Sequence, residues 1–135
     1  MPDELPIPHR EPFRFVTAAQ TVHADQALFT HPIPRGGDTF ALRMFPQLLC
    51  VEAMAQAAAA FHGLNADGEP EAGTLASVDK ARFVGVARPG DTLIIKVFRR
   101  KVFGDLVQFD GEVWVHHRMV AQAELVVRRI PAGGA

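Results

Sequence analysis

Several residue types that mark specialised protein classes are scarce in this sequence. It has one cysteine, Cys50, so no internal disulfide can form, and its apolar neighbours favour a small buried side chain over a reactive thiolate. No apolar run approaches the roughly 18 residues that a membrane-spanning helix requires. With a formal net charge of -1, the chain also lacks the basic excess that is typical of nucleic-acid-binding proteins. We therefore expect a soluble, cytoplasmic protein that binds neither a membrane nor nucleic acid.

The residues that are present fit an ordinary globular domain. Hydrophobic residues make up 48% of the 135 residues and charged residues 21%, which suits a single domain over residues 1–135. Two adjacent histidines, His116 and His117, lie in a turn-like segment with no cysteine or acidic residue spaced to complete a metal site. We expect no metal centre.

The clearest helix is predicted between Pro46 and Gly63. Proline suits the first helical turn, where its missing N–H would be unpaired anyway, and glycine is a natural stop. The segment between them, PQLLCVEAMAQAAAAFH, is apolar almost all the way round, which predicts a buried helix. Its many alanines leave little bulk, so a curved sheet can approach closely. The polar exceptions are Glu52 and Gln56.

The rest of the chain is strand-like. Turn-forming residues separate two strands before the helix and four after it, which we expect at 14–22, 27–32, 74–84, 92–103, 106–116 and 119–129. Short connections predict that the last four strands form an antiparallel meander, because parallel neighbours would need long crossovers. The expected architecture is α+β: a curled antiparallel sheet wrapped around one long central helix, which is the hot-dog fold.

Five short motifs occur in order along the chain: PHREPF at 8–13, EAMAQAA at 52–58, DKARF at 79–83, PGD at 89–91 and AQAEL at 121–125. Together they resemble the 3-hydroxyacyl-acyl-carrier-protein dehydratases of bacterial fatty-acid synthesis. The resemblance implies a homodimer or a higher homo-oligomer, which would also cover the exposed edge strands of a curled sheet. It further implies a 3-hydroxyacyl thioester substrate on the phosphopantetheine of acyl carrier protein or coenzyme A, and no other cofactor.

In the family that the chain resembles, a histidine before the helix removes the proton next to the thioester carbonyl. The helix glutamate of the partner subunit protonates the departing hydroxyl group, and a backbone N–H at the helix N-terminus polarises the carbonyl. By this resemblance Glu52 is the acid. The backbone N–H of Gln47 is the carbonyl donor, although the family usually has glycine there.

The catalytic histidine is where the sequence departs from the family pattern. The family histidine precedes the glutamate by 14 residues, and counting back from Glu52 without gaps reaches Asp38, which is the preferred assignment. The alternative base is His31, 21 residues before Glu52, which requires an insertion of seven residues. Two carboxylates can divide the acid and base roles, because a neighbouring carboxylate raises the pKa of one of them. They can also activate water as a thioesterase does, and a site that only binds acyl thioesters is a third possibility.

The substrate side of the site is expected at Gln47, Gln56, Phe40 and Phe45. Gln56 lies one turn after Glu52 and can hydrogen-bond to it, and phenylalanines can line an acyl site as well as fill a core. Basic side chains form either a solvated face or a docking surface for an acidic carrier protein; they are Lys80, Arg82, Arg88, Arg99, Arg100 and Lys101.

Overall fold

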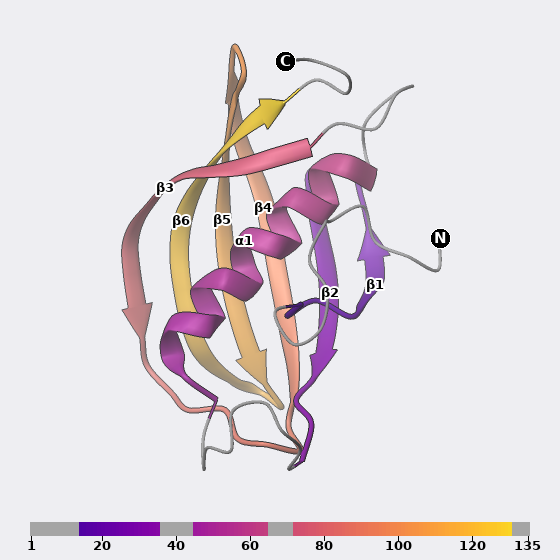
Figure 1. Ribbon diagram of the computed structural model, residues 1–135, viewed down its shortest axis with the longest axis vertical. Helices are drawn as coiled ribbons and strands as arrows, with labels where there is room; N and C mark the ends of the chain where they lie inside the picture. The colour runs from indigo at the N-terminus through magenta and orange to yellow at the C-terminus, as the bar shows by residue number, and fades with distance from the viewer. Residues whose placement is uncertain (1–13, 36–44, 65–71, 131–135) are drawn as a thin grey trace.

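A long helix, α1 (Gln47–Leu64), lies across the concave face of a six-stranded antiparallel sheet in the computed structural model, which describes residues 14–35, 45–64 and 72–130. Figure 1 shows the helix running diagonally over the strands, which curl around it. The expected hot-dog architecture is therefore confirmed. The helix begins directly after Pro46, as expected, and ends at Leu64, one residue after the glycine that was predicted to stop it.

The sheet has the order β1-β2-β4-β5-β6-β3. Its strands, in chain order, are β1 (Ala18–Val22), β2 (Gln26–Pro32), β3 (Ala72–Phe83), β4 (Thr92–Phe103), β5 (Leu106–Val115) and β6 (Arg118–Ile130). All six correspond to predicted strands, although β1 begins four residues later than expected.

The expected four-strand meander is wrong in one respect. Strands β4, β5 and β6 do form a meander, but β3 pairs with β6, and β4 receives β2 on its other side. The connection from β3 to β4 is not a hairpin, because β5 and β6 lie between these two strands in the sheet. Its backbone bonds to other segments. Val84 N–H donates to Val120 O, and Phe45 N–H donates to Ala87 O at the start of α1. The connection thus fixes the chain just before the helix.

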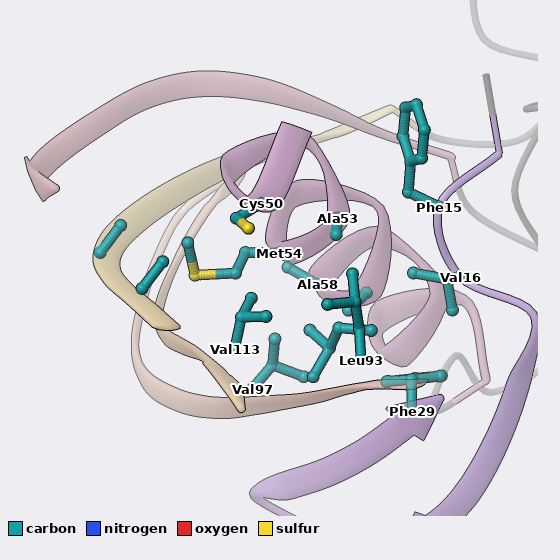
Figure 2. Close-up of a cluster of buried hydrophobic side chains, with 14 of the residues drawn as sticks. Phe15, Val16, Phe29, Cys50, Ala53, Met54, Ala58, Leu93, Val97 and Val113 are labelled. Carbon is teal, nitrogen blue, oxygen red and sulfur yellow. The ribbon is translucent and has the colours of Figure 1, made fainter. Parts of the chain in front are cut away.

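The core lies between α1 and the concave face of the sheet. Alternate residues of β2, β4, β5 and β6 point toward the helix and are buried, as the period of two in a strand requires. On the helix, small side chains such as Ala53, Ala57 and Ala58 have no exposed surface. Figure 2 shows Met54 and Ala58 between the helix and the strands, close to Val113.

Strands β1 and β3 form the two edges of the sheet. Strand β3 differs from the other strands because every residue from Thr74 to Arg82 is exposed. Leu75 and Val78 leave 39% and 38% of their surface exposed. A long edge strand with exposed apolar side chains can add another strand. Within the part of the chain that the structure describes, no helix is long and apolar enough to span a membrane.

Candidate functional site

The carboxylate of Glu52 and the amide of Gln56 lie one turn apart on α1 and are hydrogen-bonded. Gln56 Nε2 donates to Glu52 Oε1 over 3.0 Å. Gln56 is only 1% exposed, whereas Glu52 is half-buried. An amide buried this deeply is costly unless it is hydrogen-bonded. The predicted contact between these two residues is therefore confirmed.

Phe15, which the sequence did not indicate, connects this pair to the other candidate residues. Its backbone N–H donates to Gln56 Oε1 over 2.7 Å. Its ring packs edge-on against the rings of His31 and Phe45, with centroid distances of 6.0 and 5.7 Å. Phe15 is 3% exposed, so these contacts lie in the protein interior. In Figure 2 it stands beside α1, where the chain enters β1.

His31 points into the core from β2. It alternates with the buried residues Phe29 and Ile33, and only 5% of its surface is exposed. Its Nδ1 is hydrogen-bonded to Thr17 Oγ1 at 2.8 Å. Burial, and to a lesser extent the positive charge of Arg14, lower the pKa of His31 to about 4. At neutral pH the imidazole is therefore uncharged, and one ring nitrogen has a lone pair that can accept a proton.

Two hydrogen bonds to the connection between β3 and β4 hold the start of α1 in place. Phe45, which is 6% exposed, is fixed by its backbone bond to Ala87, and Gln47 Nε2 donates to Gly85 O over 3.2 Å. Gln47 is the first residue of the helix, where backbone N–H groups have no partner within the helix. This end of the helix is therefore suited to a developing negative charge; the role of the Gln47 N–H as carbonyl donor stays a prediction.

Two predicted site residues, Asp38 and Phe40, lie outside the described residues. The structure places His31 in the protein interior, in contact with Phe15, whereas sequence spacing favoured Asp38. No pattern in the sequence singled out Phe15 or Thr17, because a strand residue that binds a distant amide or imidazole looks like any other strand residue.

Other reactive groups give no competing site in the described segments. No group of three or more His, Cys, Asp or Glu side chains there could hold a metal ion. Cys50 is buried, and burial raises the pKa of its thiol to about 11. The thiol is therefore protonated at neutral pH and is a poor nucleophile. The chemistry that the described side chains can supply is acid–base catalysis by a carboxyl group and an uncharged imidazole.

Comparison with known proteins points to dehydratases. The family model described as "ApeP-like: ApeP dehydratase" matches residues 2–132. The 3-hydroxyacyl-[acyl-carrier-protein] dehydratase FabZ of Vibrio atlanticus (strain LGP32) is 35% identical over 137 residues, which cover 91% of this chain and 87% of that protein. FabZ of Coxiella burnetii (strain RSA 331 / Henzerling II) is 33% identical over 129 residues, which cover 89% of this chain and 91% of that protein.

Solved structures confirm the fold. The dehydratase heterocomplex ApeI:P from Xenorhabdus doucetiae matches with a TM-score of 0.80 and 18% identity, covering 98% of this chain and 93% of the other. TTHA0967 of Thermus thermophilus, a thioesterase superfamily member, matches with a TM-score of 0.67 and 16% identity, covering 84% and 88%. At these identities the matches establish the hot-dog architecture alone.

Proposed function

Because the chain belongs to the ApeP-like dehydratase family, we propose that it removes water from a 3-hydroxyacyl thioester to give a trans-2-enoyl thioester. The observation that carries this proposal is the half-buried Glu52 carboxyl group, held by a buried amide on the central helix. The FabZ relatives are named for this reaction on acyl-carrier-protein substrates. We extend that substrate class, carried on phosphopantetheine, to this chain. The elimination of water breaks a carbon–hydrogen and a carbon–oxygen bond without net oxidation or reduction, so acid–base groups can catalyse it and no cofactor is needed beyond the carrier.

In the proposed reaction Glu52 is the general acid and His31 is the general base. The imidazole takes the proton from the carbon between the thioester carbonyl and the hydroxyl-bearing carbon. The electron pair left behind forms the new double bond, the carbon–oxygen bond breaks, and Glu52 protonates the hydroxyl group, which leaves as water. A proton transfer from the imidazolium to the carboxylate then restores both groups.

The contact between His31 and Thr17 supports the role of the imidazole. If Nδ1 carries the ring proton and donates it to Thr17 Oγ1, then Nε2 has the lone pair that the reaction needs. The low pKa of His31 keeps the ring in this uncharged form at neutral pH. At the same end of α1, the backbone N–H of Gln47 would polarise the thioester carbonyl.

We propose that the active protein is an assembly with a second hot-dog subunit, either an identical copy or a relative. The exposed edge strand β3 supports this, since a partner strand would satisfy its outer backbone groups. The ApeI:P structure is described as a heterocomplex, so a related but different subunit is a realistic partner. By the family resemblance, the base of each subunit would act together with Glu52 of the partner subunit. A cytoplasmic location is part of the same proposal.

Incubation of the protein with a 3-hydroxyacyl thioester tests the function. We expect enoyl-thioester absorbance to rise with no release of free thiol. Free thiol without an enoyl product would instead identify a thioesterase. Tight binding without either product would identify an acyl-thioester-binding protein.

A pair of variants then tests the base. His31→Gln and Asp38→Asn each remove one candidate while keeping the side chain polar and of similar size. We expect His31→Gln to reduce the rate of enoyl formation by about 10²-fold or more, the usual contribution of a general base. We expect Asp38→Asn to retain most of the rate. The reverse pattern would assign the role to Asp38.

A further inference from the structure

The side-chain amide of Gln56 can adopt only one orientation. Its oxygen faces the backbone N–H of Phe15 at 2.7 Å, and a backbone N–H can only donate a hydrogen bond. If the amide were flipped, its NH₂ group would face another donor. Because only 1% of the Gln56 surface is exposed, water could not replace the lost hydrogen bond, and the flipped state would be high in free energy. The NH₂ group is therefore forced to face Glu52 Oε1, 3.0 Å away. Phe15 thus determines which group Gln56 presents to the carboxyl group.

This orientation gives Glu52 a fixed hydrogen-bond donor. Oε1 receives the hydrogen bond from Gln56, so the carboxyl group is held at one oxygen by a side chain whose own orientation is set by Phe15. We propose that Gln56 is a positioning residue that holds the Glu52 carboxyl group in the orientation in which it delivers its proton to the leaving hydroxyl group. This inference rests on the proposed dehydratase function and extends it from Glu52 to the residue that orients it.

Two features make this arrangement suited to positioning. The two side chains lie one helical turn apart, so the distance between them is set by the backbone of α1. Phe15 anchors the far side of the amide from a segment 41 residues earlier in the sequence, and its ring contacts His31. Because the carboxyl group must meet the leaving hydroxyl group in one orientation, a misplacement of about 1 Å can cost about 10²-fold in rate.

Two substitutions at position 56 separate positioning from folding. Gln56→Glu keeps an oxygen to accept from Phe15 N–H and replaces the amide donor with a second carboxyl group, which shares one proton with Glu52. Gln56→Met keeps the length of the side chain and removes both hydrogen bonds. We expect each to lower kcat by about 10- to 100-fold while KM changes by only a few-fold, because the loss is in proton delivery. The matched control is Gln108→Glu on β5, which should leave kcat unchanged.

A double-mutant cycle with Glu52→Gln shows whether Gln56 acts through Glu52. We expect Gln56→Met to cause no further loss of kcat in the Glu52→Gln background, because residues that act as a unit are not additive. If Gln56→Met reduced kcat equally in both backgrounds, or left the wild-type kcat unchanged, the positioning role would be overturned. A wild-type protein that forms no enoyl thioester would overturn the proposed function itself, which is a different result from either of these.

Side-chain amide NMR tests the hydrogen bond independently of activity. The two NH₂ protons of Gln56 should exchange slowly with solvent, and their resonances should move in Glu52→Ala. Fast exchange with no shift in Glu52→Ala would contradict the contact on which the inference depends.

Discussion

The buried, uncharged state of His31 predicts that folding stability falls as the solution becomes acidic. The unfolded chain protonates this histidine near its ordinary pKa of 6.5, whereas the folded chain does so only near pH 4. Between these values the unfolded state binds more protons, so stability is complete above pH 6.5 and is lost as the pH falls toward 4. Each pH unit within this interval costs about 1.4 kcal/mol. The expected loss is about 2 kcal/mol at pH 5 and about 3 kcal/mol over the full interval.

Urea unfolding at fixed protein concentration, followed at several pH values between 7 and 4.5, measures this effect. Carboxyl groups also titrate in the lower part of this range, so the informative quantity is the difference between the wild type and His31→Gln. The glutamine does not titrate, so the two stability curves should converge as the pH falls. A control variant, His117→Gln at the exposed β5–β6 turn, should retain the wild-type pH dependence. Parallel loss of stability in the wild type and His31→Gln would refute the reasoning.

Three further predictions concern packing, reactivity and assembly. Gly111→Ala should reduce the free energy of unfolding by about 1–3 kcal/mol, because an added Cβ would lie 2.7 Å from the Met54 sulfur; unchanged urea unfolding would show that Met54 can move aside. Cys50 should react slowly with a thiol reagent in the folded protein and rapidly in urea, since burial raises its pKa to about 11; equal rates would contradict its burial. Refolding a mixture of inactive His31→Gln and Glu52→Gln chains should restore up to about a quarter of the wild-type activity if each site combines two subunits, and no recovery would argue against shared sites.

The fold could be predicted from the sequence because its signals are local. Pro46, the alanine-rich helix and the alternation of apolar residues in each strand each specify an element without reference to the rest of the chain. Strand pairing depends instead on which strand a connection reaches, and for this reason the prediction of a four-strand meander failed for β3. The eight residues from Val84 to Asp91 are too few for a parallel crossover, which favoured a hairpin, yet they bond to Val120 and Phe45 and connect strands that are not neighbours in the sheet.

The residues of the candidate site divide in the same way, into those with a local sequence signal and those whose role depends on distant contacts. Glu52 and Gln56 could be identified because two polar side chains interrupt an apolar helix at a spacing of one turn. Phe15 and Thr17 could not, since their roles depend on contacts with distant residues: a backbone bond to Gln56 and a side-chain bond to His31. The assignment of Asp38 by spacing stays a prediction, because it depends on the segment before the helix having the same length as in the family.

The catalytic role of Glu52 is the central claim, and the rate of enoyl-thioester formation by wild type and Glu52→Gln tests it most directly. The substitution keeps the shape of the side chain and removes the proton that it donates. We predict that Glu52→Gln folds with wild-type cooperativity and forms the enoyl thioester about 10²- to 10⁴-fold more slowly, as expected for loss of a general acid. An equal rate in the two proteins would contradict the assignment of Glu52 as the acid.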